Sequence, residues 1–136
     1  MLMKKTKISM ICFSVIAIIL EIIPFGAVLN FVDDGITIRK TFSYFSLTPF
    51  GYANFAPFIV ALLTCVLFVL SVIYVIKNKK SLRKAISVVS LVSVILSLAP
   101  LLYGVDYFTV VAGFISAVLL VNFTVSLFIR NSEIDV

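Results

Sequence analysis

Four apolar runs, each about as long as a helix that crosses a bilayer, constrain this sequence more than any other feature. In lipid, every backbone N–H must be paired within its own segment, so runs of this length are expected to be helices although they are rich in Val and Ile. The predicted spans cover residues 8–29, 55–76, 85–103 and 107–129. We therefore predict an all-α membrane protein, a bundle of four transmembrane helices forming one domain over residues 1–136.

The composition excludes a soluble domain and most catalytic chemistry. Hydrophobic residues make up 62% of the chain and charged residues 12%, against about 45–50% and about 25% in soluble domains. The chain has no His and only two Cys, so it holds no Ser–His pair, no H-E-x-x-H motif and no metal-ligand cluster. We expect a protein that is not an enzyme and that uses no metal and no cofactor.

Lys and Arg are distributed unevenly between the two sides of the predicted bundle. Of the 11 basic residues, only Arg39 and Lys40 lie in the loop 30–52, and the others flank the opposite ends of the spans. The positive-inside rule then predicts a cell-membrane protein with both termini and the loop 77–84 in the cytoplasm, and the loop 30–52 outside. Residues that set this topology and contact lipid headgroups are expected to be Lys77, Lys79, Lys80, Arg83 and Lys84. A loop this short cannot form a nucleic-acid groove, so we expect no nucleic-acid partner.

The outer loop 30–52 carries the signature of a small β-hairpin. Apolar and polar residues alternate from Ile36 to Tyr44, as in a half-buried strand. The preceding Asp34-Gly35 pair is typical of a two-residue type I′ turn, with residues 29–33 as the partner strand. A lone hairpin is marginally stable in water, so we expect it to lie on the helix ends with its apolar side inward. The aromatic residues that follow it are typical of a membrane interface or, alternatively, of a docking face.

Helix N-caps and small residues give further expectations about the bundle. Asn54 and Asp106 are the predicted N-caps of the second and fourth spans. Serines at helical spacing in the third span, and small residues four apart in the fourth, favour close packing of helices. The residues expected in these packing stripes are Ser87, Ser90, Ser93, Gly113 and Ala117.

Glu21 is the one ionisable residue well within a predicted span. An acid at this depth is costly, so it should face protein or water and not lipid. Pro24 frees the carbonyl of Leu20 beside it, and Thr64 and Ser97 should lie at similar depth. We take Glu21, Thr64 and Ser97 as a candidate intramembrane polar site. It is either a structural acid held neutral by hydrogen bonds or a site that carries a proton or cation.

Two family resemblances bear on this choice. Four helices with a strand-forming first outer loop are similar to the claudin-like tetraspan proteins in architecture, but this chain has no Trp and no Cys in that loop, so no function is carried over. An acid in the first span, within Ala17–Ile23, is similar to the small-multidrug-resistance transporters. Those transporters have short loops, little charge bias and a Trp in the substrate cavity, from which this chain departs.

The sequence leads to two functional hypotheses. In the first, the chain is a multi-pass, non-enzymatic accessory or interaction module in the lipid bilayer, whose outer loop meets another membrane protein or a second copy. In the alternative, it is a small proton- or cation-coupled transporter that uses Glu21.

Overall fold

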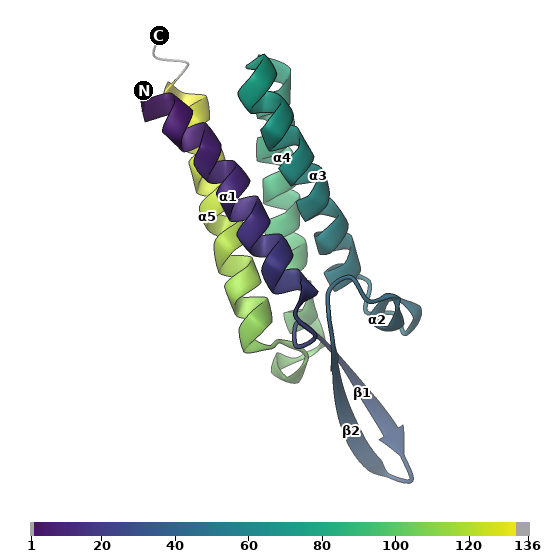
Figure 1. Cartoon of the computed structure of the whole chain (residues 1–136). Helices are drawn as coiled ribbons and strands as arrows, with labels where there is room; N and C mark the ends of the chain where they lie inside the picture. Colours follow the sequence, from purple (N-terminus) through teal and green to yellow (C-terminus); the bar gives the residue numbers. More distant parts are fainter. Residues whose placement is uncertain (1, 133–136) are drawn as a thin grey trace.

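Four long helices pack side by side, and a β-hairpin extends from one end of them (Figure 1). The structure is a computed structural model that describes residues 2–132. The long helices are α1 (Leu2–Ile22), α3 (Ala56–Lys77), α4 (Lys80–Ser97) and α5 (Val110–Ser132). Both α1 and α4 contact α3 and α5, which closes a four-helix bundle.

Among residues 2–132, three helical segments are long and apolar enough to cross a membrane: Ala56–Lys77, Lys80–Tyr103 and Val110–Asn131. The first long helix, α1, is not among them. Lys4, Lys5 and Lys7 lie in its first two turns and Glu21 lies in its last, so each stretch of sufficient length contains too many charges. These three segments support a membrane protein, and α1 is a fourth bundle helix that carries more charged residues than the other three.

The first helix ends earlier than the sequence predicts. It stops at Ile22 and not near residue 29, and residues 27–29 belong instead to strand β1 (Ala27–Asp33). Pro24 explains the end of the helix, because it has no N–H to donate and its ring clashes with the preceding turn. The backbone after it finds its hydrogen bonds in the hairpin, where Gly26 N donates to the carbonyl of Phe42 at 3.1 Å.

The other three long helices overlap the predicted spans but begin and end at different residues. The predicted cytoplasmic loop 77–84 is reduced to Asn78 and Lys79, with Asn78 in the left-handed conformation at φ 46°. The third predicted span is α-helical only to Ser97, and Pro100 lies in the following 3-10 helix η1 (Ala99–Tyr103). A second 3-10 helix, η2 (Val105–Tyr107), precedes α5.

The two predicted N-caps are wrong. The Asn54 side chain does not cap α3, because its Nδ2 donates to the Val28 carbonyl at 3.1 Å and so ties the hairpin to the bundle. Asp106 lies in η2, one turn before α5 begins. The cap of α5 is Thr109, whose hydroxyl oxygen accepts from Ala112 N at 3.0 Å.

The predicted β-hairpin is present. β1 pairs antiparallel with β2 (Ile36–Phe42), from Ala27 opposite Phe42 to Asp33 opposite Ile36. The two turn residues, Asp34 and Gly35, have φ of 47° and 79°, and positive values at both positions are what a type I′ turn requires. The Asp34-Gly35 signal therefore located the turn correctly.

The hairpin does not lie on the helix ends, which corrects our expectation. It stands away from the bundle (Figure 1), and Val32 and Ile36 near its tip are 75% and 67% exposed. Only its base is buried, at Ala27, Val28 and Leu29. Seven-residue strands reach roughly 20 Å, and the first few residues are enough to cover the end of the bundle, so the rest extends beyond it. The short helix α2 (Leu47–Gly51), capped by the Ser46 hydroxyl, connects the hairpin to α3.

The interior of the bundle follows a seven-residue repeat that places polar side chains inside. On α1 the buried positions are spaced by three and four residues, which is the coiled-coil pattern of inward-facing side chains. These positions are Lys7, Met10, Ser14, Ala17 and Glu21. Two apolar clusters fill the remaining core, one around Val60 and Ile115 towards the hairpin and one around Leu67 and Ile129 towards the other end.

Candidate functional site

Glu21 and Thr64, two of the three residues predicted to share a polar site, are in contact. Both are fully buried, and the Thr64 hydroxyl lies 2.8 Å from Glu21 Oε1, to which it donates. The same hydroxyl lies 2.9 Å from the Val60 carbonyl on its own helix, so its single proton is shared between two acceptors. The contact joins the last turn of α1 to α3.

Tyr44 is a third member of this site that the sequence did not reveal. Its backbone N–H donates to the Glu21 carbonyl at 2.9 Å, and its side chain is 1% exposed in the core beside Ala17 and Ile115. Gly26 makes this position possible, since a Cβ there would come within 2.8 Å of the Tyr44 ring. The alternation placed Tyr44 on the apolar side of the predicted strand, but it did not link this residue to Glu21.

Two polar atoms of this site have no hydrogen-bond partner among the residues that the structure describes. They are Glu21 Oε2 and the Tyr44 hydroxyl, both buried. Burial raises the pKa of Tyr44 above its ordinary value, and the Glu21 carboxylate raises it further. Tyr44 is therefore a neutral phenol close enough to feel the charge of Glu21, and the two residues lie where the segment after β2 meets α1.

Neither a cavity nor the third predicted residue reaches this acid. None of the main cavities formed by the described residues is lined by Glu21. The Ser97 hydroxyl donates to the Val94 carbonyl at 2.7 Å on its own helix, and the Ser97 carbonyl faces the Ser116 hydroxyl at 3.5 Å. Ser97 is thus part of the α4–α5 contact and was assigned to the Glu21 site on depth alone.

The serine stripe of α4 faces the interior, whereas Gly113 and Ala117 of α5 face outward. Ser87, Ser90 and Ser93 are buried, and the Ser126 hydroxyl of α5 donates to Ser87 at 3.3 Å. Gly113 and Ala117 line an open groove on the outside of α5, and Ala117 is exposed. The inward positions of α5 are the neighbouring residues of its seven-residue repeat, among them Ala112 and Leu119.

Asn122 is the centre of a second buried polar contact, between α5 and α1. Its Nδ2 donates to the Ser14 hydroxyl at 3.0 Å, and both residues are fully buried. The Ser14 hydroxyl in turn donates to the Met10 carbonyl at 2.9 Å. The seven-residue spacing of Lys7, Ser14 and Glu21 was visible in the sequence and was the available signal for this interior polar face.

At the end opposite the hairpin, Lys7 joins α1 to the end of α3. Its Nζ donates to Asn78 Oδ1 and lies 4.8 Å from the centre of the Tyr74 ring. Lys7 is 9% exposed, so this basic residue is a packing element as well as a flanking charge. The basic residues at the α3–α4 connection differ, since Lys77, Lys79, Lys80 and Lys84 are exposed and Arg83 is half-buried.

Comparison with known proteins gives no match. No known protein family, no curated protein and no solved structure matches this chain significantly. Within residues 2–132, no group of three or more His, Cys, Asp or Glu side chains is placed to hold a metal ion. The function of the chain is therefore inferred from its own residues.

Proposed function

We propose that this chain is a non-enzymatic interaction module of the cell membrane, anchored by four transmembrane helices, whose outer hairpin binds another membrane protein. The observation that carries the proposal is the hairpin itself, which extends from the bundle with apolar side chains uncovered. Val32, Ile36 and Ile38 are 75%, 67% and 42% exposed. Because the sheet has only two strands, each strand also offers a free edge to which an extended segment of a partner can add.

The fourth span in this proposal is α1. It packs against both α3 and α5, so it occupies the same depth as helices that are long enough to cross a bilayer. Its outward side chains are apolar, as a lipid-facing surface requires, and include Ile16, Ile19 and Ile22 at 44%, 57% and 60% exposed. Its buried Lys7 and Glu21 point inward, where Lys7 donates to Asn78 at the end of α3 and Glu21 Oε1 accepts from Thr64.

The proposed orientation places the hairpin outside the cell. The first two turns of α1, residues 77–84 around the α3–α4 connection and the last turn of α5 lie at one end of the bundle, and these segments carry nine of the 11 basic residues. Arg39 and Lys40 lie on β2 at the other end. A Cys-free variant with Thr48→Cys on the exposed face of α2 should react with a membrane-impermeant maleimide in intact cells. Reaction only after lysis would contradict this topology.

Site-specific photo-crosslinking tests the binding role of the hairpin. A photo-reactive residue at Val32 in living cells should give a discrete product with a second protein, and the same residue at Ile19, which is apolar and exposed towards lipid, should not. Ile36→Lys should abolish the product without lowering the melting temperature, since this side chain is 67% exposed. Products of equal yield at the two positions, or a product that survives Ile36→Lys, would overturn the proposal.

One observation favours the alternative, a proton- or cation-coupled transporter. Glu21 Oε2 is buried without a hydrogen-bond partner among the described residues, as in a site that takes up a proton or an ion. Glu21→Gln keeps the shape and removes the titration. Under the interaction proposal, proteoliposomes with either protein show no pH-driven or cation flux and the two unfold at similar temperatures. Flux in the wild type that is lost in an equally stable variant would favour the transporter.

A further inference from the structure

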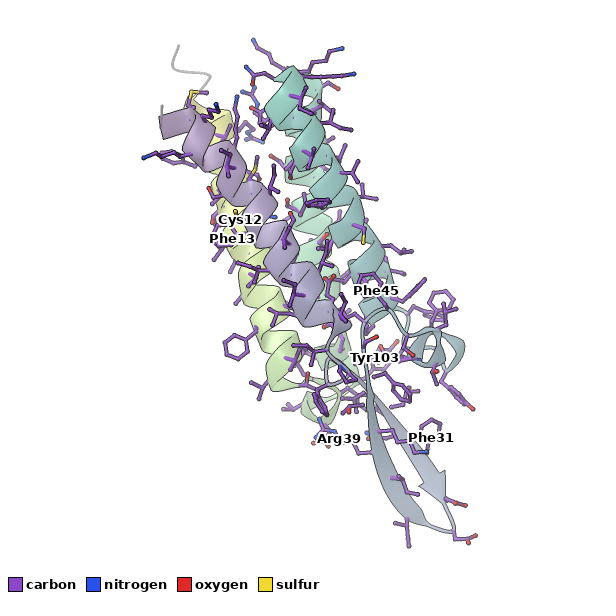
Figure 2. All side chains as sticks on the ribbon, in the orientation of Figure 1. Cys12, Phe13, Phe31, Arg39, Phe45 and Tyr103 are labelled. Atoms are coloured by element: carbon purple, nitrogen blue, oxygen red, sulfur yellow. The ribbon has the colours of Figure 1, made fainter. Side chains whose placement is uncertain are left out.

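A cavity of about 190 Å³ lies between the base of the hairpin and the ends of the helices. Four aromatic rings line it, and they come from three separate segments. Phe31 lies on β1, Tyr52 follows α2, and Tyr103 and Tyr107 belong to the two 3-10 helices before α5. Figure 2 shows Phe31 and Tyr103 at this end of the molecule. The Glu21 contact and the exposed tip of the hairpin are not part of this cavity.

The rings are arranged in two pairs. Phe31 and Tyr52 meet edge to face with centroids 5.3 Å apart, and Tyr103 and Tyr107 lie 5.9 Å apart at a tilt of 52°. The face of an aromatic ring carries a negative electrostatic potential, which is how aromatic cages in proteins bind ammonium groups. Tyr52 and Tyr103 are 65% and 58% exposed, so the cavity is open to a ligand from outside.

Asn54 adds a hydrogen-bond acceptor in the wall of the cavity. The residue is 5% exposed, and its Nδ2 is occupied by the Val28 carbonyl. Its Oδ1 is buried and has no donor among the described residues. A buried carbonyl oxygen without a donor is unfavourable, so a ligand that carries an N–H would find an unmet acceptor here. A primary ammonium has such an N–H and a quaternary one does not.

Lys40 places a positive charge beside one of the rings that line the cavity. Its Nζ lies 5.6 Å from the centre of the Phe31 ring. A simple amine would be repelled by this charge, whereas a zwitterion with an anionic group next to its ammonium would not. Phosphoethanolamine is such a group, with its phosphate two carbons from the nitrogen. A cavity of about 190 Å³ is smaller than the roughly 300–1,000 Å³ of sites for drug-sized ligands, which fits a headgroup.

We propose that this aromatic cavity binds a phosphoethanolamine group, with the ammonium between the tyrosine rings and donating to Asn54 Oδ1, and the phosphate at Lys40. The group can belong to a phosphatidylethanolamine lipid, whose headgroup lies at the depth of the helix ends, or to a soluble molecule. This binding is separate from the proposed docking at the hairpin tip, and either can fail without the other.

Titration calorimetry on the detergent-purified protein tests the proposal with four probes. These are glycerophosphoethanolamine, glycerophosphocholine, dihexanoyl phosphatidylethanolamine and dihexanoyl phosphatidylglycerol. If the phosphoethanolamine group alone is recognised, both ethanolamine compounds should bind saturably. If binding also requires acyl chains, only dihexanoyl phosphatidylethanolamine should bind. Glycerophosphocholine should bind at least fivefold more weakly than glycerophosphoethanolamine, because it has no N–H for Asn54. Absence of binding by both ethanolamine compounds, or equal binding of phosphatidylglycerol, would overturn the proposal.

Variants distinguish ligand binding in the cavity from general effects on the stability of the protein. Tyr103→Leu, at an exposed position, should weaken ethanolamine-probe binding at least threefold with an unchanged melting temperature. Lys40→Gln should weaken the phosphorylated probes and leave the affinity for plain ethanolamine the same or higher. The matched control is Phe55→Leu, an exposed aromatic residue near the same end that does not line the cavity. If Phe55→Leu weakens binding as much as Tyr103→Leu, the binding is not in this cavity.

Discussion

The bundle and the hairpin distribute polar and apolar residues in opposite ways. Inside the bundle, fully buried positions carry Glu21, Thr64 and Asn122, while the outer surfaces of the helices are lined by large apolar side chains. On the hairpin the base is buried, and the tip exposes Val32 and Ile36 beside two aspartates. Most polar groups of the first arrangement have partners within the chain, and Glu21 Oε2 and Asn122 Oδ1 are exceptions. The apolar side chains at the tip of the second are left largely uncovered by the part of the chain that the structure describes.

This contrast follows from the two solvents. Lipid gives no hydrophobic gain when apolar helices associate, so close packing and hydrogen bonds between helices supply the specificity, as between Glu21 and Thr64 or Asn122 and Ser14. In water the exposed apolar tip is unfavourable, and free strand edges are sites of association. Under the proposed function, the bundle is the anchor and the exposed hairpin is the part that binds a partner.

The largest effect is expected where the two regions meet, at Gly26. Gly26→Ala would bring a Cβ within 2.8 Å of the Tyr44 ring, which is held in the core and cannot move aside freely. We expect a loss of about 2–3 kcal/mol in the free energy of unfolding, measured by chemical denaturation in detergent. The control is Gly51→Ala, where the added Cβ meets nothing within 4 Å. Equal stability of the two variants would show that the hairpin base is not anchored through Tyr44.

A turn substitution should disrupt the hairpin and spare the anchor. Gly35 has φ of 79°, which a β-branched residue resists, so Gly35→Val should destabilise the hairpin by about 1–3 kcal/mol. Hydrogen exchange of residues 27–42 should accelerate, while exchange in α3 and α5 stays the same. Thr37→Val in β2 is the control and should keep the protection. Faster exchange in the helices of the Gly35 variant would show that the two regions are not independent.

A double-mutant cycle at Ser14 and Asn122 measures the polar interior. Ser14→Ala and Asn122→Leu each remove one side of the 3.0 Å hydrogen bond between α1 and α5. The coupling energy from unfolding in detergent should be about 0.6–1.7 kcal/mol, as for hydrogen bonds between helices in lipid. Ser9, whose hydroxyl donates to carbonyls of its own helix, provides the control cycle Ser9→Ala with Asn122→Leu and should show no coupling. If the effects of Ser14→Ala and Asn122→Leu on the free energy of unfolding are additive, this hydrogen bond does not stabilise the fold.

The smallest effect is a pH dependence from Tyr44. Its pKa is raised in the folded protein, so folding favours the neutral phenol. The resulting contribution to the free energy of unfolding is fully present below the pKa of tyrosine in the unfolded chain, about 10. It is lost as the pH rises through the higher folded value. The unfolding free energy should therefore fall more steeply above pH 10 in the wild type than in Tyr44→Phe. Identical slopes would indicate that Tyr44 is not buried.

Several features of this protein are determined by the sequence itself. The apolar runs specify long helices, the uneven distribution of Lys and Arg separates the two ends, and Asp34-Gly35 with the alternation after it specifies the hairpin turn. These signals are local, because hydrophobicity over a window and turn preference act within a few residues. The sequence also singled out Glu21 and Thr64, since an acid and a hydroxyl within apolar runs are conspicuous without any knowledge of the fold.

Only the tertiary structure decided which polar groups meet and which way the hairpin points. Ser97 lies at a depth similar to that of Thr64 yet contacts α5, and the Tyr44 side chain enters the core through the space left by Gly26. Such contacts depend on the register and rotation of whole helices, which packing along their full length sets. The hairpin stands away from the bundle because its base already covers the bundle end, and that outcome depends on the assembled shape of four helices and not on any short stretch of sequence.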